Sequence, residues 1–520
     1  MPELPGETPV PLGGRSLRAD FSRFARSTAG RFLLVLCVVF IAKQMLTVLV
    51  FPPFSGHDEV AHYSYLQTVV TEHRPPELFR CPTDQGQGCL DDLGRLTNTD
   101  FETWQGDYLP DYFYRYCEFI LDWHCESDPK WLERPFRAAN WGFPGNFPSG
   151  TQYAANHPPL YYLLLAPFVR VAPQSFSPES LQYLLRGLAI PFGLVTVLLA
   201  FLTVRQLFPS DRFLLMTVPA FVAFQPQISY EGAMVNNDIA GIALVSLVIY
   251  LLVRGVRNGF DLLLCGWIGA AVGLSMLAKT NALFIIPAVA FAIIAGTGWR
   301  NWRAWVARGI VSGGIAGVLI LPWYVWFYRT YGNLDAFEQI RTLQSPWNKP
   351  GGSFTELLFN RSFVWWRWRE TWGEFGWRRI PLDSGLLWAI ALPIIAGLIG
   401  LIVLLAVAVR RRRLGDHRNG PLGFEMPDRA QSTGLLLLLV AVVAAYIAVV
   451  QFGTDFALTQ ARYYFPIVNA FAILTLVGLR TLIPRSMRPI GAGLVVFGLV
   501  FMNLIIYTRY VIPYWHVLEA

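Results

Sequence analysis

The stretch FPPFSGHDEVAHYSYLQ, residues 51–67, places ionisable groups directly after an apolar run. Asp58 and Glu59 are its two acids, and His57 and His62 flank them. Ionisable groups at the edge of a hydrocarbon layer are costly to dehydrate, so their presence there favours a functional use. A carboxylate in such a place can act as a general base, because it can take a proton from an attacking hydroxyl group.

Further candidate residues lie at the ends of other apolar runs. Lys279 lies within LAKTNALF and Arg462 within TQARYYFP, and such cations can stabilise an anionic group. The other polar candidates are His157, Glu231, Asn236, Asn237 and Asp238. Each has an ordinary structural interpretation. Long cations snorkel to the interface, Asn and Asp hydrogen-bond between membrane helices, and Asp58 can cap the helix that follows it.

The elements that must position these residues are membrane helices. Of 520 residues, 54% are hydrophobic and 15% are charged, whereas a soluble chain carries about a quarter charged residues. The apolar residues form runs of about 16 to 25 residues, long enough to cross a hydrocarbon core as helices. The fold class is therefore an all-α polytopic membrane protein. The net charge of +7 does not require nucleic acid, because cytoplasmic loops of membrane proteins collect Lys and Arg.

The apolar runs predict eleven spans, and the positions of the arginines predict their orientation. A cytoplasmic tail (1–30) precedes the transmembrane domain (31–509), and a C-terminal tail (510–520) follows it. Extracytoplasmic loops occupy 52–182 and 329–384, and a cytoplasmic loop occupies 410–432. The expected spans are 31–51, 183–205, 213–228, 233–253, 261–278, 281–297, 305–328, 385–409, 433–452, 463–482 and 489–509.

The apolar segment 157–172 is short for a crossing. Counting it as a span would also place the RRRR run outside. We therefore expect a helix that lies at the outer interface and begins at Pro158 and Pro159, where a helix tolerates proline.

Four cysteines lie in the first large polar loop. The spacing within each pair is eight residues, which does not match the two to four residues typical of zinc ligands. Two disulfides are expected instead, and they would place this loop in an oxidising compartment. The simplest pairing joins Cys81 to Cys89 and Cys117 to Cys125.

Aromatic residues and arginines alternate in the second large loop, within RSFVWWRWRETWGEFGWRRIPL (361–382). Trp365, Trp368 and Trp372 recur at helical spacing, which favours an interfacial amphipathic helix anchored by its aromatic side chains. A functional interpretation, compatible with the first, is that this segment borders the access route of a lipid carrier or offers rings that stack on a sugar.

Six motifs together resemble a bacterial family of integral membrane proteins. They are the DE pair after the first span, HPPLYY, NND, LAKTNALF, WGEFGW and QARYYFP. The family looks like a branch of the GT-C glycosyltransferases, which include the protein O-mannosyltransferases and the lipid A aminoarabinose transferases. The resemblance covers about 31–509 and implies a GT-C-type fold of about eleven transmembrane helices. Its large first extracytoplasmic loop would carry juxtamembrane helices.

The resemblance implies a transferase on the extracytoplasmic face of the plasma membrane. Such an enzyme moves a sugar from a polyprenyl-phosphate carrier to a lipid, glycan or protein acceptor. The acid of the first external loop is the catalytic base in GT-C enzymes, and Asp58 matches it, with Glu59 as its neighbour or substitute. Lys279 and Arg462 match the cations that hold the carrier phosphate, and His157 stands where some relatives have lysine.

The NND motif supplies the remaining substrate-binding candidates, Asn237 and Asp238. Some GT-C members also need a divalent metal such as Mg²⁺ or Mn²⁺, held partly by acids of the second external turn. Glu231 and Asp238 match those acids, but they are too few oxygen ligands to predict a metal site.

The chemistry fits these residues independently of any family. Transfer from a sugar phosphate needs one base, and the departing phosphate is a stable anion that needs no second carboxylic acid, unlike glycoside hydrolysis. Direct displacement would invert the anomeric centre. A partly dehydrated Asp58 is expected to be a stronger base than a carboxylate in water.

Two other classes of function compete with the transferase. A transporter or flippase for lipid-linked sugars or small solutes would use Asp58 and Lys279 as coupling groups. The sequence has no evident inverted repeat and no matched pair of broken spans, which argues against a transporter. The third class is a non-catalytic scaffold for assembly of the cell envelope.

Overall fold

The computed structural model describes residues 27–77, 152–335, 351–414, 427–457 and 459–519. Helices dominate these ranges, and the one strand among them is the two-residue β1 (Ile380–Pro381). The all-α prediction is confirmed. The predicted disulfides lie outside the described residues and stay predictions; their cysteines are Cys81, Cys89, Cys117 and Cys125.

Within the described ranges, nine helical segments are long and apolar enough to cross a membrane. They match nine of the eleven expected spans, and the prediction of a polytopic membrane protein is confirmed. Their main helices are α2 (Thr28–Val50), α7 (Pro178–Leu207), α10 (Asp238–Asn258), α12 (Ile286–Thr297), α13 (Trp302–Tyr331), α18 (Ser384–Leu414), α19 (Arg429–Asp455), α20 (Val468–Leu482) and α21 (Arg488–Ile506).

Two expected spans form shorter helices, α8 (Arg212–Phe224) and α11 (Leu262–Ala278). At 1.5 Å per residue they extend roughly 20 and 26 Å, less than a hydrocarbon core of about 30 Å. α8 ends because Gln225 caps the next helix, α9 (Pro226–Glu231), where Pro226 takes the first helical position. α11 ends at Lys279, whose backbone is extended.

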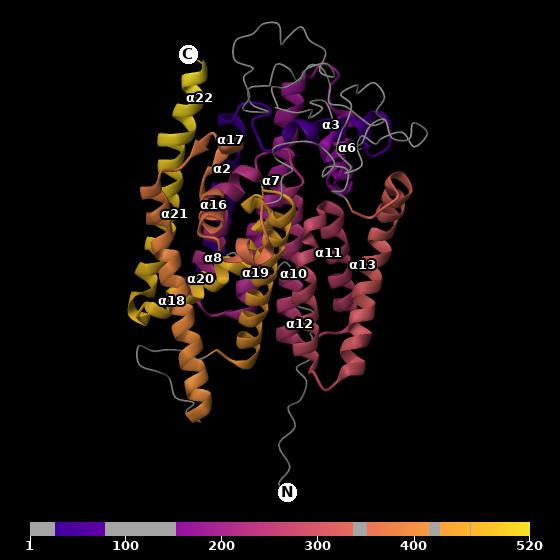
Figure 1. Cartoon of the computed structure of the whole chain (residues 1–520). Helices are drawn as coiled ribbons and strands as arrows, with labels where there is room; N and C mark the ends of the chain where they lie inside the picture. The colour runs from indigo at the N-terminus through magenta and orange to yellow at the C-terminus, as the bar shows by residue number, and fades with distance from the viewer. Residues whose placement is uncertain (1–26, 78–151, 336–350, 415–426, 458, 520) are drawn as a thin grey trace.

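The segment 157–172 forms the helix α6 (Leu160–Val171), which is too short to cross a membrane. It packs against α3 (Glu59–Thr71). Figure 1 shows both helices in the upper part of the molecule.

Long helices surround a buried centre (Figure 1). α10 packs against α7 and α11, α11 packs against α13, and α18 packs against α20. Most of α10 and of the segment that leads into α20 is buried. The end of α2 and the start of α10 lie at the same end of the helical bundle as α3. Residues that are far apart in sequence therefore meet there.

Candidate active site

Asp58 occupies the N-cap position of α3, but its side chain makes no capping hydrogen bond. Its backbone is left-handed, with φ 57° and ψ 12°, a conformation that aspartate adopts more readily than most residues. The carboxylate instead forms an ion pair with Arg462, 404 residues away in sequence. The capping interpretation of Asp58 is therefore wrong.

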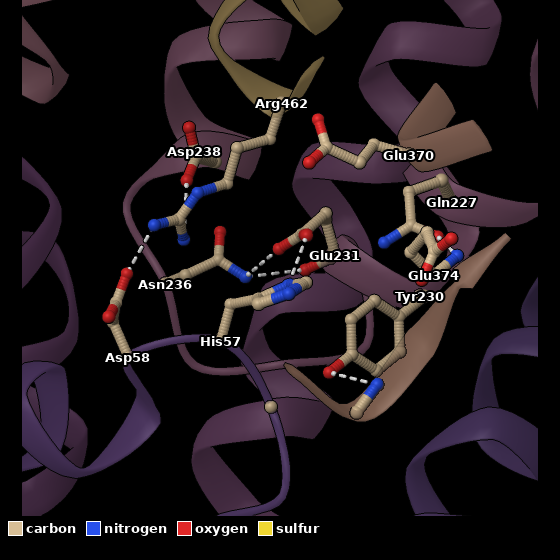
Figure 2. A network of polar contacts seen from close by, with 12 residues as sticks. His57, Asp58, Gln227, Tyr230, Glu231, Asn236, Asp238, Glu370, Glu374 and Arg462 are labelled. Carbon is tan, nitrogen blue, oxygen red and sulfur yellow. Dashed lines mark hydrogen bonds and ion pairs between the residues drawn. The ribbon is translucent and has the colours of Figure 1, made fainter. Parts of the chain in front are cut away.

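Arg462 connects Asp58 to a second ion pair, as Figure 2 shows in part. Its Nη1 lies 3.6 Å from Oδ2 of Asp238, and Oδ1 of Asp238 pairs with Nζ of Lys279. Within the described residues, Nη1 of Arg462 and Oδ2 of Asp238 have no hydrogen-bond partner. The result is a row of alternating charge, Asp58–Arg462–Asp238–Lys279, which we call the charge row.

The charge row is assembled from four parts of the chain. Asp58 ends the turn after α2, and Asp238 is the first residue of α10. Lys279 lies between α11 and the 3₁₀ helix η6 (Thr280–Ile285), and Arg462 lies in the 3₁₀ helix η8 (Ala461–Ile467). Asp58 is the most exposed member, since 14% of its side chain is accessible against 9% or less for the others.

Arg462 reverses an expectation about the strength of Asp58 as a base. Burial acts to raise the pKa of Asp58, but the charge and hydrogen bond of Arg462, together with smaller contributions from His62 and His57, outweigh it, and the net pKa is well below the ordinary value. The prediction that dehydration makes Asp58 a stronger base is therefore wrong for this arrangement. Asp58 stays ionised, and its proton affinity depends on where Arg462 lies.

The amides of the NND motif fix backbone segments around the charge row. Nδ2 of Asn237 donates to the carbonyl of Ala278 at 2.9 Å, which fixes the residue before Lys279. Nδ2 of Asn236 donates to Glu231, at 3.0 Å to the backbone oxygen and 3.1 Å to Oε2. Both amides therefore link backbone segments that carry site residues.

Glu231 lies in a different contact group from Asp238. Its Oε1 is 3.0 Å from Nδ1 of His57, a contact visible in Figure 2, and Asn236 binds its other oxygen. Within the part of the chain that the structure describes, no three His, Cys, Asp or Glu side chains gather as metal ligands. Of the two acids that the resemblance suggested as metal ligands, Asp238 faces Lys279 and Arg462, and Glu231 faces His57 and Asn236.

Burial favours the neutral form of two histidines near the charge row. His157 is buried before α6, where burial and the charge of Lys279 hold its pKa well below the ordinary value. His62 stacks on it with ring centroids 5.7 Å apart, and burial lowers the pKa of His62 to about 4. His157 can therefore form hydrogen bonds, but it adds no positive charge.

An apolar groove of about 870 Å³ leads to Lys279 and His157. One wall is α19, on which Leu436, Val443 and Ile447 are 48%, 47% and 44% exposed. These positions recur at helical spacing, so they form one stripe along α19. The other wall comes from η6 and α12 and includes Leu283, Phe284 and Pro287.

The family match covers most of the chain. Residues 37–474 match the model described as "Predicted membrane protein (DUF2142)". The chain belongs to the DUF2142 family. No protein with a curated description is detectably similar to it in sequence.

Solved structures similar to this DUF2142 protein include two of ArnT from Cupriavidus metallidurans. The one bound to undecaprenyl phosphate is 12% identical, with TM-score 0.44 and coverage of 90% of this chain and 64% of that chain. The apo one is 14% identical, with TM-score 0.43 and coverage of 89% and 63%.

The archaeal oligosaccharyltransferase AglB from Archaeoglobus fulgidus, in complex with an inhibitory peptide and a dolichol-phosphate, is also similar. It is 12% identical, with TM-score 0.47 and coverage of 91% of this chain and 55% of that chain. The DUF2142 protein thus spans less than two thirds of these solved chains.

Glu59 lies next to Asp58 in the DUF2142 sequence, but it is fully buried in a separate ion pair with Arg186. Its oxygens accept from Nε and Nη2 of Arg186 at 2.9 and 2.6 Å and from the backbone of Gly56 and Val235 at 2.8 Å each. These contacts occupy both oxygens of Glu59.

The sequence interpretation overlooked Arg186, which also donates to three backbone carbonyls, those of Val48, Phe51 and Pro52. The pair therefore fixes the turn that carries Asp58. A lone arginine inside the apolar run LLRGLAIPFGLV was the available signal, because such a residue needs a partner.

The second loop of the DUF2142 protein packs against the site through α16 (Arg361–Trp372) and α17 (Phe375–Arg378). Oε2 of Glu370 accepts from the backbone of Ala461 at 2.8 Å, directly before Arg462. Trp372 is 1% exposed. The interfacial-helix prediction is therefore wrong for the end of this segment, which is part of the protein interior.

Proposed function

We propose that this protein is a membrane glycosyltransferase. It would move a sugar from a polyprenyl-phosphate donor to a hydroxyl group of a cell-envelope acceptor. The observation that carries the proposal is the apolar groove, which ends at the charge row. An isoprenoid tail needs an apolar surface, its phosphate needs cations, and the acceptor hydroxyl needs a base, and these three features adjoin one another here.

The groove suits a long lipid tail. Its stripe on α19, from Leu436 to Gln451, measures roughly 22 Å at 1.5 Å per residue, most of the thickness of a hydrocarbon core. Lys279 lines the end of the groove that meets the charge row. A tail lying along α19 would bring its phosphate to that lysine.

The donor phosphate would also activate Asp58. A phosphate between Lys279 and Arg462 competes with the carboxylates for both cations, and Nη1 of Arg462 has no hydrogen-bond partner among the described residues. When Arg462 turns toward the phosphate, the interaction that lowers the pKa of Asp58 weakens. Asp58 then becomes a stronger base at the moment when the donor is in place.

The proposed reaction is a single displacement. Asp58 takes the proton of the acceptor hydroxyl while the acceptor oxygen forms a bond to the anomeric carbon. The bond from that carbon to the phosphate oxygen breaks, and its electron pair leaves with the polyprenyl phosphate. Lys279 and Arg462 stabilise the charge on the leaving oxygen, and the anomeric centre is inverted. Asn237 and Asp238 hold the two cations in place, and His157 donates a hydrogen bond to the donor phosphate.

We place this site on the extracytoplasmic side of the plasma membrane. Asp238 begins α10, and Arg254 and Arg257 lie near the other end of that helix, as the positive-inside rule expects of a cytoplasmic side. Further arginines lie at or beside ends of α7, α8 and α13, namely Arg205, Arg212, Arg300 and Arg303.

A tryptophan in the groove tests where the lipid lies. Val443→Trp fills the space beside α19, and we expect the KM for the polyprenyl-phosphate donor to rise by about tenfold, a loss of about 1.4 kcal/mol of binding. Val318→Trp is the matched control, because Val318 on α13 is 71% exposed and outside the groove. Equal KM values for the two variants would place the lipid elsewhere.

The pH dependence tests the activation of Asp58. A base works when deprotonated, so activity falls as the pH drops through its pKa. In the free protein Arg462 lowers the pKa of Asp58, so kcat/KM should show no acid limb from this group at about pH 5 to 8. kcat reports the complex, and its acid limb is expected at higher pH. If the acid limbs of kcat and of kcat/KM lie at the same pH, the donor does not activate Asp58.

A further inference from the structure

A second pocket lies at the opposite ends of the helices that carry the charge row. It has a volume of about 650 Å³ and is bounded by the start of α2, the turn between α7 and α8, the end of α10 and the turn between α20 and α21. Its charged lining residues are Asp211, Arg212, Arg257, Arg480, Arg485 and Arg488. The pocket plays no part in the proposed transfer.

We propose that this pocket binds the phosphate-bearing headgroup of an anionic phospholipid from the adjacent leaflet. Among the described residues that line it, five are arginines and one is an acid. Basic pockets between transmembrane helices are a recurring way to hold anionic lipid headgroups. Arginine suits this task because its planar fork can donate two hydrogen bonds to one phosphate.

The acidic residue of the pocket serves the fold. Oδ1 of Asp211 caps α8 by accepting from the backbone of Leu214 at 3.1 Å, and Oδ2 lies 2.5 Å from Nε of Arg480. Arg257 pairs with Asp428 at 2.5 Å. Arg480 and Arg257 therefore each face one carboxylate, and arginine is the commonest charged residue of the described lining.

The arrangement of the pocket favours a lipid over a free anion. Arg480 is buried, whereas Arg212 and Arg485 are exposed at the rim. The wall also contains apolar side chains, among them Phe213 and Met216. A headgroup can reach the arginines while the first methylenes of its acyl chains contact this apolar wall, which a free phosphate would leave uncovered.

Native mass spectrometry of the purified full-length protein in a neutral detergent tests the proposal. The protein is titrated with phosphatidylglycerol, phosphatidylcholine or inorganic phosphate. The pocket variant is Arg485→Gln with Arg488→Gln. The matched control is Arg300→Gln with Arg303→Gln, which removes the same charge near the start of α13 but outside the pocket.

We expect the wild type and the control to bind phosphatidylglycerol in preference to phosphatidylcholine. The pocket variant should bind it at least about tenfold more weakly. Equal binding by the pocket variant, an equal loss in the control, or equal binding of both lipids overturns the proposal. Displacement of the lipid by millimolar phosphate would assign the pocket to a free anion and also overturn it. If the double variant does not fold, Arg212→Gln at the exposed rim replaces it. This variant should bind phosphatidylglycerol several-fold more weakly than the wild type, and the same results would overturn the proposal.

Discussion

Replacing Asp58 by asparagine is expected to lower kcat for sugar transfer by about 10²- to 10⁴-fold, the usual contribution of a general base. Asparagine has nearly the same shape and can still accept a hydrogen bond from Arg462, but it cannot take a proton at neutral pH. The rate is measured with purified protein, a polyprenyl-phosphate sugar and an acceptor from the cell envelope. Thermal unfolding measured in parallel checks that the variant is folded.

Glu72→Gln is the control for Asp58→Asn. Glu72 directly follows α3 and pairs with Arg74 at 2.6 Å on the exposed surface, so its loss should leave kcat unchanged. Full transfer by the Asp58→Asn protein would remove Asp58 as the base. If the wild type transfers no sugar but moves lipid-linked sugars across proteoliposomes, and the Asp58→Asn protein does the same, the protein is a carrier and not a transferase.

A large effect on the free energy of unfolding is expected when Arg186 is replaced. Arg186→Met is expected to cost about 3 to 5 kcal/mol, because it leaves the fully buried Glu59 without its cation. The carbonyls of Val48, Phe51 and Pro52 also lose a donor. The measurement is the yield and thermal unfolding of the detergent-solubilised protein. We expect little folded protein at the growth temperature.

The control for this prediction is the double variant Arg186→Met with Glu59→Leu. Replacing both partners by apolar groups removes the unpaired charge, so much of the lost stability should return. Arg186→Lys should not restore it, because an ammonium group lacks the planar fork that reaches both the carboxylate and the carbonyls. If the Arg186→Met protein is as stable as the wild type, the ion pair does not hold the turn before α3.

The sequence allowed the membrane class and all four residues of the charge row to be singled out, but not the way in which they pair. Lys279, Arg462 and Asp238 stand out because each is a charged residue at the end of an apolar run. The role of Glu59 could not be predicted in the same way. Asp58 has a left-handed backbone, and the adjacent carboxylates pair with different arginines. No local pattern in the sequence specifies these partners.

Other differences between the sequence predictions and the structure come from tertiary contacts, which a hydropathy profile does not contain. The tryptophan spacing in 361–382 predicts an apolar face, but whether that face meets lipid or protein depends on η8, almost 90 residues later. The expected span 213–228 is interrupted because Gln225 caps α9. Hydropathy averaged over a whole span does not reveal this, because one polar residue hardly changes the average. The order of charges in the row likewise depends on where four chain segments meet.

The charge row holds two carboxylates and two cations, and the two cations bear on how the proposed reaction would end. A sugar-linked carrier is a phosphodiester with a single negative charge, whereas the released carrier is a monoester with a charge near −2 at neutral pH. The same two cations would therefore attract the spent carrier more strongly than the loaded one. Turnover would then be limited by departure of the spent carrier, and its accumulation in the bilayer would slow the enzyme.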